Sequence, residues 1–497
     1  MTSQTPATTN PSPEQPSGVT ANQERKRKIL EHAERMASGR LAWKRRNAYF
    51  HEKDLGYLRF MIPEGAKVLE LGCGVGDLLA NLKPSFGVGV DVSPAMVEEA
   101  RRLWPDLTFH IGDMELPETL AAIDGGPFDF IVLSDTIGSL EDCQRVFESL
   151  HLLCDRNTRI VVGYYNYVWE MILRLAERLH LKMPQTVQNF LAPADIKNLF
   201  ELAGYDVVNQ QRRILSPRHM LGLGELINRL LAPMPIINRA ALRDYTVARS
   251  RVHAGEPGLS ASVVIPCRNE RGNIETALKT MPRFSSRLEI IFIEGHSQDG
   301  TQEEIDRVAK VYAEEFDIKT MTQPGKGKGD AVRAAFDAAT GDVLMILDAD
   351  LTVAPEELPK FFNLIEQGQA EFVNGSRLVY PMEEEAMRFL NLIANSLFAR
   401  AFSWLLGQRV TDTLCGTKVL KRLDYERTKS IRTYFDELDP FGDFDLLFGA
   451  ARGNLKIVEV PIRYRGRAYG ETQISRFRHG WMLLKMAVLA FRKMKAI

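Results

Sequence analysis

A chain of 497 residues has room for two or three domains, each with its own hydrophobic core. Its composition, 45% hydrophobic and 26% charged, is that of an ordinary soluble protein, and a net charge of −1 excludes a general electrostatic attraction to nucleic acid. The five cysteines stand at scattered positions, which indicates a reducing compartment with free thiols and disfavours a disulfide framework or a zinc site.

The N-terminal tail, residues 1–23, consists mainly of Thr, Ser, Pro, Gln and Asn. With so few large apolar residues it cannot bury enough surface to fold, and we expect it to be disordered. Basic clusters at residues 25–28 and 44–46 follow on a predicted helix. We interpret these clusters as a solvated helix face rather than a nucleic-acid patch.

Strands and helices then alternate, beginning with a strand at residues 68–71 that runs into Gly72, Gly74 and Gly76. Glycines let the backbone pass close to a ligand, which the N-terminus of the next helix would face. A dinucleotide fingerprint needs a further glycine where this chain has Asp77, so the pattern disfavours NAD. The next strand ends at Asp91, a carboxylate placed to accept hydrogen bonds from a ribose diol.

Two further strands end at polar residues, one before Asp113 and Met114 and the other before Ser134. The ordered set resembles the class I S-adenosylmethionine-dependent methyltransferases over roughly residues 45–215. The resemblance implies that the glycine loop holds the methionine end of S-adenosylmethionine, that Asp91 holds its ribose, and that Asp113 and Met114 flank its adenine. The candidate cofactor-binding residues are Glu70, Gly72, Gly74, Gly76, Asp91, Asp113, Met114 and Ser134.

The methyl acceptor has no recognisable motif in this half. Aromatic residues at 164–169 follow the fifth strand, and they either line an acceptor pocket or belong to a packed core. Methyl transfer depends above all on alignment, so few catalytic groups are needed. A domain of the same fold without a cofactor is the alternative.

A connector without strand–helix alternation is predicted at residues 216–258. Its segment 221–231 has helical spacing and ends before Pro233 and Pro235. This helix could complete the first domain, pack between domains or lie on a membrane; we favour packing. Glycines and a proline at residues 255–258 mark the domain boundary.

The second half again places polar residues after buried strands. The first strand stops at Pro266 before Asn269 and Glu270, and the second ends at Glu294. A loop containing Lys328 precedes an apolar run that ends in two aspartates one residue apart, Asp348 and Asp350. Such strands form one parallel sheet with a ligand cleft at their carboxyl ends. The two aspartates suit a divalent cation that bridges to phosphate oxygens.

These motifs resemble the family 2 glycosyltransferases, which have an A-type fold, over about residues 261–478. The resemblance implies that Pro266, Glu270 and Glu294 lie against the nucleoside of a nucleotide-sugar donor, with Asn269 in the same motif and Lys328 nearby. It also implies that Asp348 and Asp350 hold ribose, Mg²⁺ or Mn²⁺, and diphosphate. This chain has Glu294-Gly295-His296 where the family commonly has two acids and a glycine.

The acceptor decides which catalytic groups are needed for attack that inverts the anomeric carbon. A hydroxyl requires a general base, for which Asp443 or Asp445 is the candidate. A phosphate is already ionised, because its second pKa is about 6, and requires cations instead. Alternate arginines at residues 463–467 share one face of a strand, as they also would on a solvated edge strand.

Two segments, residues 411–418 and 467–472, resemble the dolichyl-phosphate mannose synthase branch of the family. That resemblance implies a polyprenyl-phosphate acceptor with Arg377, Arg388 and Arg467 near its phosphate. Apolar segments at residues 387–406 and 481–491 carry basic residues and could lie in a membrane interface or pack within the domain. Without a signal peptide or an uncharged apolar run of about 18 residues, we expect a cytoplasmic protein with peripheral contact at the cytoplasmic membrane face.

The sequence therefore predicts an α/β protein with two Rossmann-like doubly wound domains, a methyltransferase at residues 24–215 and a glycosyltransferase at residues 259–497 that ends in an amphipathic helix. The expected activity is metal-dependent, inverting sugar transfer to a polyprenyl phosphate, fused to methyl transfer. One alternative is sugar transfer to a hydroxyl of a glycan or small metabolite. Another is a non-catalytic scaffold with one decayed domain. The pattern indicates no oligomeric state.

Overall fold

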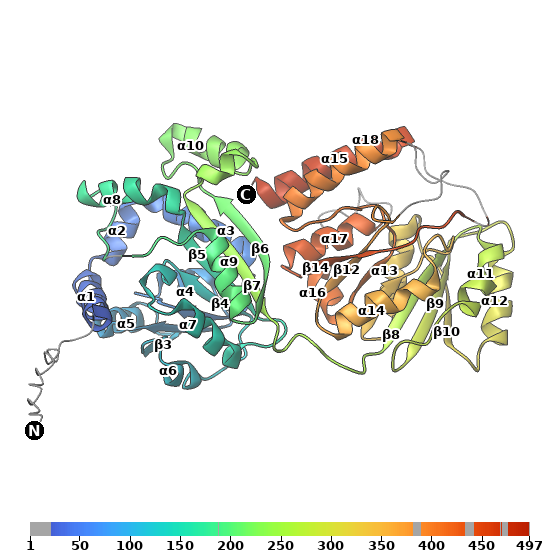
Figure 1. Ribbon diagram of the computed structural model, residues 1–497, viewed down its shortest axis with the longest axis horizontal. Helices are drawn as coiled ribbons and strands as arrows, with labels where there is room; N and C mark the ends of the chain where they lie inside the picture. Colours follow the sequence, from blue (N-terminus) through green and yellow to red (C-terminus); the bar gives the residue numbers. More distant parts are fainter. Residues whose placement is uncertain are drawn as a thin grey trace, which may run out of the picture.

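The computed structural model describes residues 21–186, 188–380, 389–432, 442–467, 469 and 476–496. Two α/β domains stand side by side, the N-terminal one on the left of Figure 1 and the C-terminal one on the right. Each is built on a seven-stranded sheet with helices on both faces. The predicted fold class, two doubly wound α/β domains, is confirmed.

The first sheet has the strand order β3-β2-β1-β4-β5-β7-β6. Its strands pair in parallel except β7, which runs antiparallel to both β5 and β6. The strands are β1 Lys67–Leu71, β2 Phe86–Asp91, β3 Thr108–Ile111, β4 Phe130–Ser134, β5 Arg159–Tyr165, β6 Tyr205–Arg213 and β7 Arg243–Ser250. The α-helices of this half are α1 Ala21–Met36, α2 Arg40–Arg46, α3 Ala48–Met61, α4 Asp77–Leu82, α5 Pro94–Leu103, α6 Pro117–Ala121, α7 Cys143–Leu150, α8 Glu170–Arg178, α9 Pro193–Leu202 and α10 Leu223–Leu226.

The second sheet has the order β10-β9-β8-β11-β13-β12-β14, and only β13 runs antiparallel to its neighbours among the described strands. The strands are β8 Ala261–Cys267, β9 Leu288–Glu294, β10 Asp317–Thr322, β11 Val343–Ile346, β12 Phe372–Ser376, β13 Lys418–Lys421 and β14 Ile457–Pro461. The α-helices are α11 Ile274–Lys279, α12 Thr301–Val311, α13 Lys328–Ala338, α14 Leu358–Glu366, α15 Phe389–Leu406, α16 Arg422–Arg432, α17 Asp443–Arg452 and α18 Arg476–Ala490.

The central strands are buried along their whole length because helices cover both faces of each sheet. Every residue of β5, β9 and β11 is buried. Strands buried on both faces read as continuous apolar runs, which is the pattern that located β9 and β11 in the sequence. The polar residues that follow these strands are thereby brought to one edge of each sheet.

The structure differs from the predicted connector at residues 216–258, because β7 lies within it and completes the first sheet between β5 and β6. All eight residues of β7 are buried, including Arg243 and Arg249, so its charged residues hid a core strand from hydropathy patterning. The predicted helix at 221–231 is present as α10 and a π-helical turn, Ile227–Leu231. At the N-terminus, α1 begins inside the predicted tail at Ala21, and residues 1–20 lie outside the described part.

Glu70 fastens the turn between β1 and α4. Its buried carboxyl accepts a hydrogen bond from the backbone N–H of Leu79, at 3.0 Å, and so joins the strand to the helix. Burial raises the pKa of Glu70 to about 8, and the nearby Asp77 raises it further, whereas Lys44 opposes the shift. The carboxyl is therefore protonated near neutral pH.

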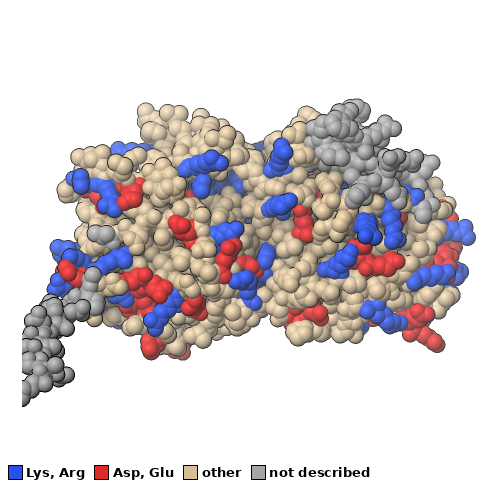
Figure 2. All heavy atoms as spheres, in the orientation of Figure 1, with Lys and Arg blue, Asp and Glu red and all other residues tan. Residues whose placement is uncertain are grey.

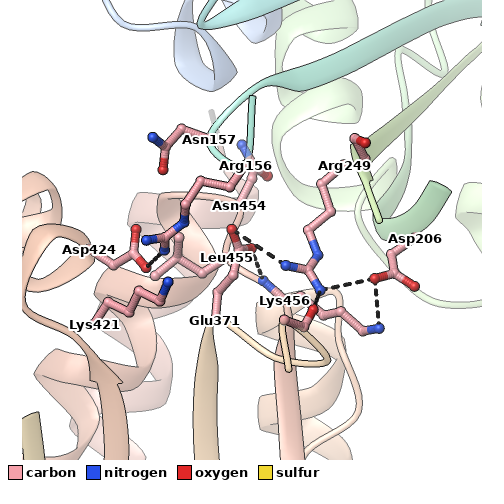
Figure 3. Close-up of polar contacts among 12 residues, drawn as sticks. Arg156, Asn157, Asp206, Arg249, Glu371, Lys421, Asp424, Asn454, Leu455 and Lys456 are labelled. Atoms are coloured by element: carbon pink, nitrogen blue, oxygen red, sulfur yellow. Dashed lines mark hydrogen bonds and ion pairs between the residues drawn. The ribbon is translucent and has the colours of Figure 1, made fainter. Parts of the chain in front are cut away.

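The two domains meet through a buried carboxylate, Glu371, which Arg159 and Arg249 of the first domain contact; Figure 3 shows Glu371 with Arg249. Arg159 places Nη2 at 2.8 Å from both carboxylate oxygens, and Arg249 Nη1 lies 3.8 Å from Oε1. Burial alone would raise the pKa of Glu371, but Arg159 and Arg249 outweigh it and hold that pKa below its ordinary value. The paired charges fix the two sheets relative to each other.

Further polar contacts surround this pair. Arg156 Nη2 lies 2.9 Å from Asp424 Oδ2, and Lys456 Nζ lies 2.8 Å from Asp206 Oδ2, so charges cross the interface in both directions (Figure 3). The chain beyond α18 also contacts the first domain, where Arg213 Nη2 donates to the carbonyl of Met494 at 2.8 Å. The interface therefore extends from the ends of β5 and β7 to the C-terminal segment.

Replacing Glu371 with Gln is expected to lower the free energy of unfolding by about 3–5 kcal/mol, because Arg159 would keep a buried charge without a counter-charge. Glu64→Gln is the control: this carboxylate pairs with Lys83 at 3.2 Å, but both side chains are exposed, at 71% and 60%, and its loss should cost less than about 1 kcal/mol. Chemical denaturation measures both. Equal losses would show that the buried pair does not hold the domains together.

Replacing Glu70 with Gln should flatten the dependence of stability on pH. Between the ordinary pKa of 4.5 and about 8, the folded state retains the proton that the unfolded chain releases. The contribution of Glu70 to the free energy of unfolding is therefore largest below pH 4.5. It falls by at most about 1.4 kcal/mol per pH unit as the pH rises from 4.5 toward 8. Gln keeps an acceptor for Leu79 without titrating. Thermal unfolding from about pH 5 to 8 checks this, with the exposed Glu98→Gln as control; parallel wild-type and Glu70→Gln curves would contradict it.

Candidate active sites

A cavity of about 820 Å³ opens at the carboxyl ends of the first sheet's strands. Its volume lies within the range of small-molecule sites and exceeds what a single small metabolite needs. Six of the eight predicted cofactor residues line it: Glu70, Gly72, Asp91, Asp113, Met114 and Ser134. The structure thus gathers residues that are 64 positions apart (134 − 70) around one space.

Gly74 and Gly76 shape the loop beside this cavity. Gly72, Gly74 and Gly76 have φ angles of 76°, 54° and 73°, a region that favours glycine. A Cβ atom on Gly72 would stand 2.3 Å from the hydroxyl oxygen of Thr136. Asp91 accepts hydrogen bonds from the N–H of Gly74 at 2.8 Å, so the carboxylate predicted to bind ribose also holds the loop in place.

Helices α1 and α2 cover the cavity and direct lysines into it. Lys26 Nζ lies 2.8 Å from both Asp113 Oδ2 and Glu115 Oε2, and Lys44 Nζ lies 2.6 Å from Asp77 Oδ2. The interpretation of the basic clusters as a solvated face is therefore wrong for these two side chains. Their acidic partners are 87 and 33 residues away in the sequence, so no local pattern indicated the pairs.

A buried arginine, Arg243 of β7, braces the floor of the site. Its Nε lies 2.9 Å from Asp54 Oδ1, its Nη2 donates to the Ser134 hydroxyl at 2.9 Å, and its Nη1 pairs with Asp135. Ser134 is thus held by the protein itself while it lines the cavity. Sequence reasoning missed Arg243 because it belongs to the strand assigned to the connector.

The aromatic segment at the end of β5 is divided between the cavity and the core. Tyr165 and Trp169 line the cavity, whereas Tyr164 lies in the hydrophobic core of the domain. His51 also lines the cavity, and burial lowers its pKa to about 4 with help from Lys44, so its imidazole is neutral at physiological pH. The cavity therefore has room for an acceptor beside the cofactor residues.

The second site lies where β8, β9 and β11 end. Lys328 Nζ lies 2.6 Å from Asp348 Oδ1, and Arg467 Nη2 lies 2.7 Å from Asp350 Oδ2. The two predicted metal-binding carboxylates are each matched with a cation. Both aspartates keep partly exposed side chains, 28% for Asp348 and 16% for Asp350, so ligands can reach them.

The predicted nucleoside-binding residues surround these pairs. The Glu270 carboxylate accepts hydrogen bonds from Nδ2 of Asn273 at 2.8 Å and from Nη1 of Arg467 at 3.3 Å. Asn269 has a positive φ of 56° and accepts a hydrogen bond from the backbone of Gln298. Glu294, at the end of β9, accepts one from the N–H of Ser297. Pro266 stands in β8, next to these residues in the chain.

The carboxylates of Asp348 and Asp350, which come after β11, suit a divalent cation that is bound together with a nucleotide. Within residues that the structure describes, no group of three or more His, Cys, Asp and Glu side chains is arranged to hold a metal ion. Two carboxylates are nevertheless what Mg²⁺ takes from a protein when substrate phosphates complete its coordination. Asp348 and Asp350 supply that pair and fit Mg²⁺ or Mn²⁺.

The candidate bases and acceptor cations have different surroundings. Asp443, at the start of α17, lies 3.7 Å from Lys328 Nζ and therefore belongs to the cluster, whereas Asp445 is only 1% exposed. Arg377 forms a two-pronged pair with Asp412, at 2.7 and 2.8 Å, which occupies its Nε and Nη2. Arg388 lies outside the described residues.

Comparison with known proteins places one family on each half of the chain. The model "Methyltransferase domain" matches residues 43–210, and the model "Glycosyl transferase family 2" matches residues 262–425. The first match covers the glycine loop and part of the cavity lining. The second covers β8 to α16, including Asp348 and Asp350.

Two curated relatives match the second half. A dolichyl-phosphate hexose transferase of Haloferax volcanii is 33% identical over 231 residues, which are 46% of this chain and 92% of the relative. A dolichol-phosphate mannosyltransferase of Pyrococcus furiosus is 28% identical over 222 residues, 44% of this chain and 60% of the relative. The chain belongs to the family 2 glycosyltransferases, and it joins that glycosyltransferase domain to an N-terminal methyltransferase domain.

Proposed function

We propose that the C-terminal domain transfers a sugar, with inversion, from a nucleotide-sugar donor to a polyprenyl phosphate, using a divalent metal. The observation that carries this proposal is the pairing of two strand-end carboxylates with two cations, Asp348 with Lys328 and Asp350 with Arg467. Carboxylates suit a metal ion and a ribose, and cationic side chains suit phosphates. One cluster of residues can therefore bind both the nucleotide-sugar donor and the phosphate acceptor. The two relatives, whose names refer to dolichyl and dolichol phosphate, support the same acceptor class.

The donor half would use Asp348, Asp350 and Lys328. A divalent cation held by the two carboxylates would supply Lewis-acid stabilisation of the leaving diphosphate. Burial alone would lower the pKa of Lys328, but Asp348 and Asp443 outweigh it and raise that pKa. The ammonium group therefore stays charged and is positioned to stabilise the negative charge that develops on the diphosphate.

The acceptor half would use Arg467. Its guanidinium stands between Asp350 and Glu270, at the edge of the donor site. An ionised phosphate oxygen attacks the anomeric carbon from the face opposite the diphosphate; the new C–O bond forms as the bond to the diphosphate breaks. No proton has to be removed, so a general base is unnecessary. Arginine suits this role because its forked donors match phosphate oxygens.

The N-terminal domain would bind S-adenosylmethionine in the 820 Å³ cavity. The positive φ angles of the glycine loop and the cavity-lining carboxylates of Asp91 and Asp113 fit the cofactor's methionine, ribose and adenine groups. When bound, the cofactor supplies an activated methyl group on a sulfonium. The chain's own contribution is to hold and orient the two substrates and to exclude water by means of α1 and α2.

A hydroxyl acceptor is the second candidate, and one observation favours it. Asp443 lies within the cluster, 3.7 Å from Lys328, where a general base for a hydroxyl would be needed. Asp445 is nearly fully buried and is the weaker choice for this role. The presence of Arg467 beside the donor carboxylates favours the phosphate acceptor.

Peripheral membrane contact through α18 belongs to the same proposal. In the part of the chain that the structure describes, no helix combines the length and apolar character needed to cross a bilayer. Helix α18 buries Met486 and Ala490 in the core and exposes Trp481, Leu484 and Val488. An exposed apolar row followed by basic residues is typical of a helix that lies in the membrane interface.

Replacing Asp350 with Ala is expected to lower glycosyl transfer by at least about 100-fold, because a charged group at the diphosphate is lost. S-adenosylmethionine binding, measured by calorimetry, should persist because the two sites lie in different domains. Asp342→Asn is the matched control. Asp342 immediately precedes the first residue of β11, its carboxylate accepts a hydrogen bond from Ser260, and its replacement should leave glycosyl transfer unchanged. If Asp350→Ala lost both glycosyl transfer and S-adenosylmethionine binding, the conclusion that the two sites are independent would be contradicted.

The acceptor class can be tested with a panel of nucleotide sugars and Mg²⁺ or Mn²⁺, offered polyprenyl phosphate or water-soluble hydroxyl acceptors. We expect turnover on polyprenyl phosphate, reduced at least about 100-fold in Arg467→Lys because the forked donor is lost. Transfer should survive in Asp443→Asn, since a phosphate needs no base. Turnover only on hydroxyl acceptors, abolished by Asp443→Asn, would overturn the phosphate assignment in favour of the second candidate.

A further inference from the structure

A broad apolar surface remains uncovered on the methyltransferase domain. It consists of one segment around α8 and a second around α10, which we call the α8–α10 face. Three of its side chains project almost completely into solvent: Met171 is 85% exposed, Ile236 is 81% exposed, and Leu221 is fully exposed. The other large apolar residues of this face are Val168, Ile172, Leu175, Leu179, Leu223, Leu226, Leu230 and Leu231. Contiguous exposure of this kind marks an interaction surface.

The two segments of this face are joined by direct hydrogen bonds. Trp169 Nε1 donates to the carbonyl of Ala240 at 2.8 Å, and Asn166 Nδ2 donates to the carbonyl of Arg239 at 3.3 Å. Both segments lie along the upper edge of the domain in Figure 1. The exposed residues therefore belong to one side of the molecule rather than to separate patches.

The charge around the face is positive. Residues 217–242 contain three exposed arginines, Arg218, Arg229 and Arg239, and one acidic residue, Glu225. Lys53 Nζ lies 2.6 Å from the Glu225 carboxylate and neutralises it. In Figure 2 the upper edge of this domain is largely uncharged, with blue and no extended red surface. Apolar residues beside unopposed basic ones are complementary to a bilayer that carries anionic lipids.

The cofactor cavity reaches the surface at this face. Ile172 of α8 and Arg218 before α10 both line the cavity, and both are exposed. Leu173, which is buried, continues the apolar lining inward. A molecule that enters here passes from an apolar surface toward Asp91 and the glycine loop. This path suits an amphiphile, whose apolar part stays outside while its polar group reaches the cofactor.

The same side of the molecule continues onto the other domain. Helices α8, α10, α15 and α18 all lie along the upper edge of Figure 1, and α18 exposes Trp481, Leu484 and Val488 beside Lys485. The Glu371 interface fixes the two domains, so both surfaces can rest on one plane. A bilayer is such a plane, and this favours a lipid surface over a second copy of the chain.

We propose that the α8–α10 face seats the methyltransferase domain on an anionic lipid bilayer, and that the cavity takes its methyl acceptor from that bilayer. The acceptor is a lipid whose polar head group enters beside α8. The methyl carbon passes from the sulfonium sulfur, which keeps the electron pair of the broken C–S bond, to a nucleophilic oxygen or nitrogen of the head group, whose proton leaves to water. This assignment does not rest on the acceptor proposed for the glycosyltransferase.

Flotation with phosphatidylcholine–phosphatidylglycerol vesicles tests the seating. The triple variant Met171→Glu, Leu221→Glu, Ile236→Glu should partition at least about tenfold more weakly than the wild type, because charges replace inserted apolar groups. The control triple Leu202→Glu, Val252→Glu, Val311→Glu changes exposed apolar residues outside the face and should bind within about twofold of wild type. S-adenosylmethionine affinity should be unchanged in both, which shows that they fold.

The outcomes separate this inference from the membrane contact of α18. Weaker partitioning of the α8–α10 variant supports it even if Trp481→Glu in α18 has no effect. Normal flotation of the α8–α10 variant overturns it, whatever Trp481→Glu does. The proposal is also overturned, in favour of a second copy of the chain, if the wild-type protein does not bind vesicles but forms a dimer in sedimentation equilibrium and the α8–α10 variant does not form that dimer.

A fluorescent label tests the orientation. An environment-sensitive dye on Leu221→Cys should shift its emission to the blue when vesicles are added, because the dye enters the lipid. The same dye on Val311→Cys of α12, away from this face in Figure 1, should not shift. The five native cysteines are buried or half-buried, so the labelled wild-type chain supplies the background. No shift at position 221 in vesicle-bound protein would overturn the proposal.

Discussion

The arrangement of the whole molecule depends on one buried carboxylate. Glu371 is enclosed where the two domains meet and is neutralised by Arg159 from β5 and Arg249 from β7. Burying a charge is costly unless it is paired and fully hydrogen-bonded, and removing one partner costs far more than the pair gains. The pair is therefore best understood as a specificity device: it permits one relative orientation of the sheets and penalises others.

That orientation gives the two active sites a common relation to their surroundings. Each site lies at the carboxyl edge of its own sheet, where parallel strands deliver polar residues to a crevice. The cavity around Asp91 and the cluster around Asp350 lie in separate domains, so each chemistry has its own set of charges. The apolar helices along one side of the molecule are what the two domains share.

The two sites also illustrate different uses of buried charge. In the methyltransferase domain, Arg243 is fully enclosed and braces Asp54, Asp135 and Ser134, so its charge serves the architecture of the cavity. In the glycosyltransferase domain, Lys328 and Arg467 pair with carboxylates that remain partly exposed, so their charges are available to an anionic substrate. Exposure of the partner distinguishes the structural pair from the candidate functional one.

The sequence by itself determined the fold class and the two families, and it singled out candidate site residues, because these depend on local patterns: an apolar strand, then a short polar or glycine-rich turn. Asp348 and Asp350 follow β11 directly, and Gly72 follows β1. Only the tertiary structure decided the rest, because its contacts join distant residues. Lys26 meets Asp113 across 87 positions, and Arg159 meets Glu371 across 212. Strand β7 stayed hidden because buried arginines interrupt its hydropathy, and their burial is possible only once partners from elsewhere in the chain are in place.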